Sequence, residues 1–224
     1  MSTVGSRLAG RLAAARKNER DELLALAEGM PDLIRLGRGD PDLPTPEYIV
    51  DAAIAAMHSG FTHYTHWAGA IDLRQEIARK LSEENGLDYD PSSEIMVSTG
   101  VQEAIYLTFQ ALLDPGDEVL IADPFYTSYA TAVALAGGRL VRIPTRREHD
   151  HVLQPEAVEA AITPKSKVLV IVSPCNPTGA VIPREMLERI AGLAQRHGLV
   201  VVSDEIYEKL VFDGCSHTSI ASFP

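Results

Sequence analysis

The second half of the chain alternates short apolar runs with longer stretches in which apolar and polar residues recur at helical spacing. The runs predict strands over residues 95–98, 119–122, 140–143, 168–172 and 199–202. The stretches between them predict helices over residues 101–113, 127–136, 155–162 and 184–196. Strands that alternate with helices form βαβ units, so the pattern predicts an α/β fold with a mainly parallel sheet flanked by helices. Because 199–202 is continuously apolar, its strand is expected to be buried on both faces.

The first part of the chain is predicted to be helical. Its three expected helices cover residues 6–28, 46–57 and 70–85. Pro46 is expected to open the second helix, with Thr45 as its cap, and Gly86 is expected to end the third. Between the helices lie a turn-rich loop, GRGDPDLPTP, and a loop rich in histidine and aromatic residues, HSGFTHYTHWAG.

Size, charge and cysteine content limit the class of protein. A chain of 224 residues with 46% hydrophobic residues is long enough for one domain, or one and a fraction, with a real core. The 31 acidic residues outnumber the 20 basic residues and give a net charge of −11, which argues against a nucleic-acid surface and against an anionic membrane. No apolar run approaches the ~18 residues of a membrane span. The two distant cysteines, Cys175 and Cys215, favour the reducing cytoplasm.

Two motifs with well-known chemistry are set aside. The sequence GRG at residues 37–39 begins like a dinucleotide-binding fingerprint, but the third glycine is missing and a proline follows two residues later. His58, His63 and His66 gather in one loop, yet their spacing matches no common set of metal ligands. We therefore expect neither a Rossmann site nor a metal site here.

The residues just beyond the predicted strands are the candidates for a binding site, because open α/β sheets bind ligands at the carboxyl ends of their strands. After the first strand, the turn at Gly100 leads into a helix whose first N–H groups would hold a single phosphate. The other candidates are Tyr126 after the second strand, Asn176 after the fourth, and Asp204 with Tyr207 after the fifth. Taken singly, each has an ordinary structural explanation: a tight turn, a core aromatic, a chain break, or the cap of a following helix.

Together these groups suit a flat, phosphorylated heteroaromatic ring. An ionised carboxylate such as Asp204 would keep a ring nitrogen protonated, and the positive ring would withdraw electrons from an adjacent carbanion. Tyr126 would stack on the face of the ring, and Asn176 and Tyr207 would hold a phenolate oxygen. The ring with these properties is pyridoxal 5'-phosphate, which the sequence predicts as the cofactor.

The motifs, taken in order, resemble those of the fold-type I aminotransferases of class I and II, of the aspartate aminotransferase type. The matching segments are GDPDLPTP, THYTHWAGAIDLR, STGVQEA, DPGDEVLIADPFYTSY, SPCNPTGAV and VVSDEIYEKL. The resemblance implies an incomplete large domain of a pyridoxal-phosphate-dependent transferase over residues 45–224. It implies that residues 1–44 form an N-terminal arm and a helical part of the small domain. It also implies transamination between an amino acid and a 2-oxo acid, by a homodimer when the protein is full length.

The resemblance assigns roles to single residues. Those expected to bind the cofactor are Gly100, Val101 and Gln102 at its phosphate, Tyr126 on its ring, Asn176 and Tyr207 at its phenolic oxygen, and Asp204 at its nitrogen. Gly39 would offer its backbone to the substrate carboxylate. Tyr64 would reach across a dimer interface to the neighbour's phosphate. The bonds before Pro174 and Pro177 fall where the family often has cis peptide bonds.

One part of the family pattern is missing. The lysine that forms a Schiff base with the cofactor is expected downstream of Asp204, but the chain ends at Pro224, and Lys209 lies too close to Asp204 to be that residue. The arginine that grips the substrate carboxylate is missing as well. We therefore expect a fragment that is inactive alone and unstable, with an uncovered sheet edge. Two alternatives stay open: a non-catalytic remnant that binds the cofactor, and a related lyase or decarboxylase that uses it.

Overall fold

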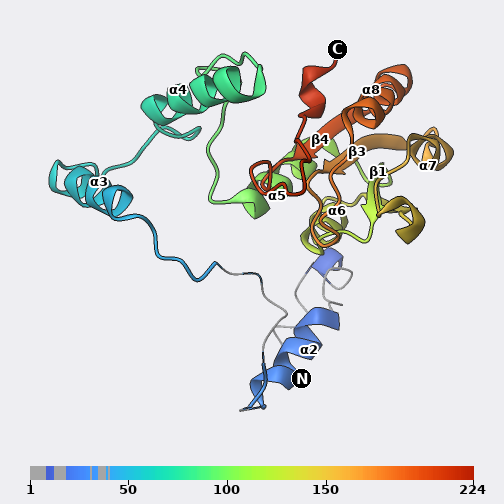
Figure 1. Cartoon of the computed structure of the whole chain (residues 1–224), viewed down its shortest axis with the longest axis horizontal. Helices are drawn as coiled ribbons and strands as arrows, with labels where there is room; N and C mark the ends of the chain where they lie inside the picture. The colour runs from blue at the N-terminus through green and yellow to red at the C-terminus, as the bar shows by residue number, and fades with distance from the viewer. Residues whose placement is uncertain (1–8, 13–18, 31, 35–38, 40) are drawn as a thin grey trace.

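The computed structural model describes residues 9–12, 19–30, 32–34, 39 and 41–224 (Figure 1). Its centre is one four-stranded sheet in which every neighbouring pair of strands is parallel, in the order β2-β1-β3-β4. The strands are β1 (Glu118–Asp123), β2 (Arg139–Pro144), β3 (Ser166–Val172) and β4 (Val200–Asp204). The predicted α/β class with a parallel sheet flanked by helices is therefore confirmed.

Alternate residues of the two central strands feed two separate cores. In β1, Val119 and Ile121 belong to one buried cluster, whereas Leu120 between them belongs to the other. In β3, Val168 and Val170 face the first cluster, whereas Leu169 and Ile171 face the second. This division follows from the period of two in a strand, and it explains why the runs are apolar throughout.

Helices cover both faces of the sheet. The first cluster contains side chains from α5 (Val101–Leu112) and α6 (Ser128–Leu135), including the fully buried Phe109 and Tyr129. The second contains side chains from α7 (Pro155–Ala161) and α8 (Arg184–His197), including the fully buried Ile190. Short 3-10 turns η3 (Arg147–His149) and η4 (Ile220–Ser222) complete this part of the chain. The carboxyl ends of all four strands consequently lie at one edge, between two packed layers.

The expected strand over residues 95–98 is wrong. These residues join no sheet, although Ile95 is buried and Val97 donates its N–H to the carbonyl oxygen of Ala68 at 2.9 Å. A strand requires a row of backbone partners on a neighbour, and only this isolated bond is present among the described residues. The apolar pattern was thus correct about the burial of Ile95, but Met96 is 48% exposed and the expected pairing is absent.

The expectation that 199–202 is buried on both faces is also wrong. Val200 is 42% exposed, and Val201 and Val202 are half-buried. The reason is the position of β4 at the end of the strand order, where it pairs only with β3 among the described strands. An edge strand lacks the second neighbour that buries a central one.

The helices before residue 95 lie apart from the sheet (Figure 1). They are α2 (Glu19–Glu28), α3 (Glu47–His58) and α4 (Ile71–Lys80), which continues into a π-helical turn η2 (Leu81–Asn85). Gly86 ends η2 in the left-handed conformation at φ 67°, as expected of a helix-ending glycine. Residues 6–8 and 13–18 of the predicted helix 6–28, and residues 35–38 and 40 around the turn-rich loop, lie outside the described residues, and α2 confirms the last part of that helix.

The predicted cap of α3 is wrong. The residue at the N-cap position is Pro46, at φ −52° and ψ 138°, and it makes no side-chain cap hydrogen bond. The helix itself begins at Glu47, so Thr45 lies one position too early to accept from the first turn. Across the described residues, moreover, no helix is long and apolar enough to cross a bilayer.

Candidate functional site

A cleft of about 1040 Å³ opens at the carboxyl ends of the strands. Its lining is Gly39, Thr99–Gln102, Phe125–Thr127, Val172, Pro174–Pro177, Asp204, Ile206, Tyr207 and Leu210. The structure therefore brings together every residue that the sequence singled out for the site, with the exception of Tyr64. These residues come from five separate stretches of the chain, and three of the stretches lie at the ends of β1, β3 and β4, which the parallel topology gathers at one edge.

The N-terminus of α5 offers free backbone donors to the cleft. Gly100 turns the chain into the helix at φ 80° and ψ 168°, a conformation that favours glycine. The N–H of Thr99 is taken by the carboxylate of Glu103. The N–H groups of Val101 and Gln102 have no acceptor among the described residues, as is usual in a first helical turn. Because both residues line the cleft, this end of α5 suits an anion.

Asp204 is held in place from two sides. Its Oδ2 accepts the phenolic hydrogen of Tyr129 at 2.5 Å, and its Oδ1 accepts the N–H of Ile206 at 3.2 Å. No helix begins at Ser203 or Asp204 in this described stretch, so Asp204 closes a turn and does not cap a helix. β4 places Asp204 beside Val172 in the register with β3. The carboxylate is thereby held in the lining of the cleft.

Tyr129 is a residue that the sequence analysis missed. It is fully buried on α6, and its burial, followed by its hydrogen bond to the charged Asp204, raises the pKa of the phenol well above its ordinary value of 10.0. The phenol therefore stays protonated and acts as a donor to the carboxylate. Its only signal in the sequence is its position three residues after Tyr126, which places both near one end of a short helix.

The segment between β3 and α8 brings Asn176 to Tyr207. The Ser173 N–H donates to the carbonyl oxygen of Asp204 at 3.2 Å, and the Cys175 N–H donates to the carbonyl oxygen of Ala180 at 2.9 Å. The Nδ2 of Asn176 then lies 3.5 Å from the hydroxyl of Tyr207, a long hydrogen bond. The bonds before Pro174 and Pro177 are cis, as the resemblance implied, and so is the bond before Pro124. Asn176 and Tyr207 are thus close enough to bind one oxygen atom together.

Of the two remaining predicted site residues, Gly39 lies at the cleft and Tyr64 does not. Tyr64 is fully exposed in the loop between α3 and α4, and it does not line the cleft. Gly39 does line the cleft, but the residues on either side of it are not described. A single copy of the described chain therefore places Gly39, and not Tyr64, at the proposed site.

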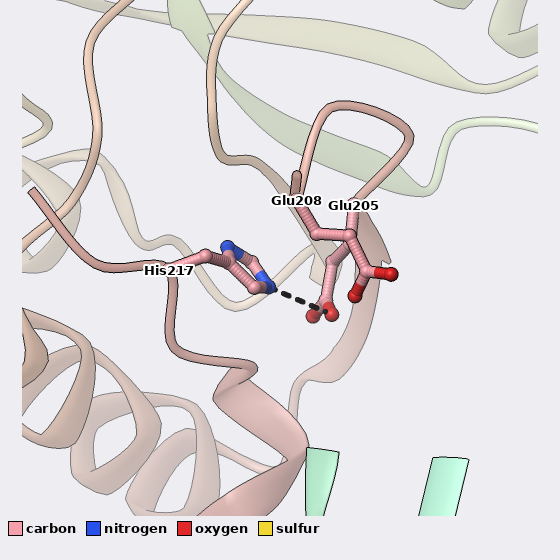
Figure 2. Close-up of side chains that lie close together, drawn as sticks. All are labelled: Glu205, Glu208 and His217. Atoms are coloured by element: carbon pink, nitrogen blue, oxygen red, sulfur yellow. Dashed lines mark hydrogen bonds and ion pairs between the residues drawn. The ribbon is translucent and has the colours of Figure 1, made fainter. Parts of the chain in front are cut away.

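A second group of polar side chains comes from the segment that follows β4 in the chain, and Figure 2 shows its three members side by side. Ligand atoms of Glu205, Glu208 and His217 lie within 4.8 Å of one another. The Nε2 of His217 is 3.1 Å from Glu205, which also accepts hydrogen bonds from Ser203 and Ser219. Glu208 is occupied by Lys80 and by the amide of Asn85. Because protein donors already bind both carboxylates, the group ties the segment after β4 to its surroundings; His58, His63 and His66 are not part of it.

The donor set of the cleft fits a phosphorylated pyridine ring. The free N–H groups of α5 suit the phosphate, and the braced carboxylate of Asp204 suits a protonated ring nitrogen. Asn176 and Tyr207 provide hydrogen-bonding groups that suit a phenolate oxygen. Tyr126, half-buried in the same lining, provides an aromatic face.

Comparison with known proteins identifies the family. The family pattern described as aminotransferase class I and II matches residues 31–223. The chain is 43% identical over 215 residues to the aspartate aminotransferase of Pyrococcus abyssi, and 42% identical over 215 residues to aromatic-amino-acid aminotransferase 2 of Thermococcus litoralis. In both comparisons the match covers 96% of this chain and 55% of the relative.

Solved structures give the same result. The fold matches that of the aspartate aminotransferase from Thermus thermophilus with maleate at a TM-score of 0.88 and 42% identity, over 96% of this chain and 56% of that one. It matches N-succinyldiaminopimelate aminotransferase from Mycobacterium tuberculosis at a TM-score of 0.90 and 38% identity, over the same shares of each chain. The chain thus spans about half the length of these relatives, which are pyridoxal-phosphate enzymes. The resemblance predicted from sequence motifs is confirmed: the chain belongs to the family of class I and II aminotransferases.

Proposed function

We propose that this chain is the cofactor-binding part of a pyridoxal-phosphate-dependent aminotransferase, which exchanges an amino group between an amino acid and a 2-oxo acid. The observation that carries the proposal is the single cleft of about 1040 Å³ that Asp204, Asn176 and Tyr207 share with the N-terminus of α5. Membership in the aminotransferase family supports the same reaction. The curated relatives differ in the amino acid that their names specify, so the proposal does not extend to one substrate.

In this proposal the residues of the cleft divide the work of holding the cofactor. The N–H groups of Val101 and Gln102 bind the phosphate beside Gly100, whose own N–H donates to the carbonyl oxygen of Ser98 at 2.8 Å and must turn away from it to join them. Tyr126 stacks on the ring. Asp204 binds the ring nitrogen and keeps its proton in place, because a negative carboxylate favours the positive form of its partner.

Other side chains of the proposed site orient the ring and shield it. Tyr129 holds the Asp204 carboxylate in one orientation. Asn176 and Tyr207 bind the phenolic oxygen, and apolar side chains such as Ile206 and Leu210 reduce the access of water. The cofactor itself supplies an electron-withdrawing ring that stabilises negative charge on the substrate carbon.

The remaining parts of the machinery are proposed to act on the substrate and across the dimer. A lysine beyond Pro224 is proposed as the covalent anchor and the base, and an arginine there as the partner of the substrate carboxylate. Gly39 is proposed to meet that carboxylate with its backbone. The full exposure of Tyr64 is consistent with a homodimer in which Tyr64 contacts the phosphate held by the other copy.

The proposal also includes a division of the chain and a location in the cell. Residues 45–224 are proposed as the large domain, and residues 1–44 as an arm and part of a small domain. Cys175 and Cys215 are both free thiols in the structure, which is consistent with a cytoplasmic protein.

The first experiment is the intact mass of the protein as its source cell makes it. A mass nearer twice 24.3 kDa is expected, because the chain spans 55% of its curated relatives. The purified protein should carry pyridoxal phosphate and convert an amino acid and a 2-oxo acid without releasing ammonia. A mass near 24.3 kDa with no turnover would support the non-catalytic remnant, and release of ammonia would support a lyase.

Substitution of Asp204 tests the site itself. Asp204→Ala should lower turnover by about a hundredfold or more, because preorganised charge at a reacting group commonly contributes that much. Its unfolding midpoint should change far less than its turnover. The matched control is Asp88→Ala, an exposed aspartate outside the cleft, which should leave turnover unchanged. Near-normal turnover of Asp204→Ala would contradict the assignment of this residue.

A further inference from the structure

A side-chain contact joins the two halves of the proposed cofactor site. The Nε2 of Gln102 donates a hydrogen bond to the hydroxyl of Tyr126 at 3.0 Å. Gln102 lies in the first turn of α5, and Tyr126 lies 24 residues later, in the segment between β1 and α6. Both residues line the cleft, so the bond runs along its wall.

The neighbouring residues explain why the Gln102 side chain is available for this contact. The carboxylate of Glu103 already accepts the backbone N–H of Thr99, just before the N-cap residue Gly100. Gln102 therefore has no capping task, and its amide extends toward Tyr126. Its own backbone N–H has no acceptor among the described residues and faces the position of the phosphate in the proposed function.

We propose that Gln102 is a positioning residue that couples phosphate binding to ring stacking. A single residue then serves both parts of the cofactor: its backbone donates to the phosphate, and its side chain fixes the hydroxyl end of the Tyr126 ring. The hydroxyl oxygen of a tyrosine lies on the axis of its second side-chain torsion, so a hydrogen bond to this oxygen restricts chiefly the first torsion, which sets where the ring lies. The inference rests on the proposed function, because the coupling requires a ligand with both a phosphate and an aromatic ring.

The test is a double-mutant cycle on cofactor binding. Gln102→Met keeps the length of the side chain and removes its donor, and Tyr126→Phe keeps the ring and removes its hydroxyl. The matched control is Gln110→Met, the same change at an exposed glutamine two turns further along α5. Cofactor-free protein, prepared from the full chain as the cell makes it, is titrated with pyridoxal 5'-phosphate and, separately, with inorganic phosphate. The circular dichroism of the bound chromophore is recorded at saturation.

Each single variant should bind pyridoxal 5'-phosphate about three- to tenfold more weakly, the usual effect of one lost hydrogen bond. The double variant should bind pyridoxal 5'-phosphate no more weakly than the poorer binder of the two single variants, because both changes remove the same hydrogen bond. The circular dichroism per bound cofactor should fall in all three, and affinity for inorganic phosphate should not change. The Gln110→Met control should match the unmodified protein in every measurement.

Several results would overturn the inference and leave the proposed function intact. One is a double variant whose fold-loss of affinity for pyridoxal 5'-phosphate equals the product of the fold-losses of the two single variants. A second is a Gln102→Met variant that binds pyridoxal 5'-phosphate as tightly as Gln110→Met does. A third is a Gln102→Met variant with lower affinity for inorganic phosphate, which would assign the Gln102 side chain to the phosphate alone. If the unmodified protein fails to bind pyridoxal 5'-phosphate, both the inference and the proposed function are wrong.

Discussion

Strand β1 and helix α3 are both rich in apolar residues, but they bury them very differently. Val119, Leu120 and Ile121 of β1 are at most 1% exposed. In α3, which is described in full, no side chain is buried, and Tyr48 and Met57 are 74% and 57% exposed. The apolar content of a segment therefore does not decide whether that segment lies in a core.

The difference arises from what lies next to each element. β1 is central in the sheet and has helices on both faces, so the tertiary structure covers both sides of the strand. α3 has no such layer among the described residues. A contiguous set of exposed apolar side chains of this kind is typical of a surface that another part of a protein covers. The proposed dimer, in which the nearby Tyr64 meets a second copy, supplies one such cover.

The largest expected effect is the loss of a core side chain in the sheet region. Phe109→Ala should lower the free energy of unfolding by about 3–5 kcal/mol, because it leaves a cavity beneath the sheet. Ile54→Ala in α3, where the side chain is 43% exposed in one copy, should cost less than about 1 kcal/mol. Urea denaturation of the two variants measures the contrast.

The same pair of variants can break the comparison. If Ile54→Ala costs as much as Phe109→Ala, then α3 is covered in solution, and the cost should depend on protein concentration when the cover is a second copy. A large cost that is independent of concentration would place the cover within the same chain.

The next effect concerns a buried charge at the start of β1. Glu118 is 1% exposed and binds Arg139, the Thr163 hydroxyl at 2.6 Å and the Ser166 hydroxyl at 3.3 Å. Glu118→Ala should lower the free energy of unfolding by about 2–3 kcal/mol, because it removes a charged acceptor from Arg139 and from the half-buried hydroxyls of Thr163 and Ser166. Glu159→Ala, an exposed glutamate of α7, is the control and should cost little.

The contribution of Glu118 should depend on pH. The hydrogen bond from Thr163, followed by that from Arg139 and the charge of Arg139, holds the pKa of Glu118 below its ordinary value of 4.5. Its contribution is therefore complete above about pH 4.5 and is lost as pH falls through the lowered pKa. Unfolding curves of the unmodified protein and Glu118→Ala should approach each other in acid, and a constant separation would contradict this explanation.

A smaller effect is expected from the contact behind Asp204. Tyr129→Phe removes the donor to Oδ2 and should lower the free energy of unfolding by about 1–2 kcal/mol. Because the pKa of Tyr129 is raised in the folded protein, its contribution is complete below its ordinary value of 10.0 and is lost at higher pH. The stability of the unmodified protein should therefore fall more steeply above pH 10 than that of Tyr129→Phe. Equal slopes of stability against pH for the two proteins would contradict a raised pKa of Tyr129 in the folded state.

The smallest effect is expected from exposed charges outside the sheet region. Arg79 on α4 pairs with Glu76 and Glu83, each at 2.7 Å, but all three side chains are more than half exposed. Arg79→Ala should leave the urea midpoint unchanged within error, because solvent screens such pairs. A measurable loss that persists in high salt would mean that this surface of α4 is covered in solution.

The sequence by itself determined the order of elements, the parallel sheet and most of the candidate site. Apolar runs of four or five residues, separated by helical stretches, were sufficient because local periodicity reflects which faces a core must cover. The same reasoning placed Asn176 and Asp204 at strand ends, and it placed Gly100 at the start of a helix. Parallel topology then required those ends to meet at one edge, whatever the details of packing.

Only the tertiary structure decided which apolar runs became paired strands and how the site is braced. Residues 95–98 form no ladder and Val200 is exposed, because pairing depends on neighbours that lie far away in the sequence. The Tyr129–Asp204 and Gln102–Tyr126 contacts likewise join residues 75 and 24 positions apart. Local pattern cannot specify such contacts, since they depend on the directions in which packed elements point their side chains.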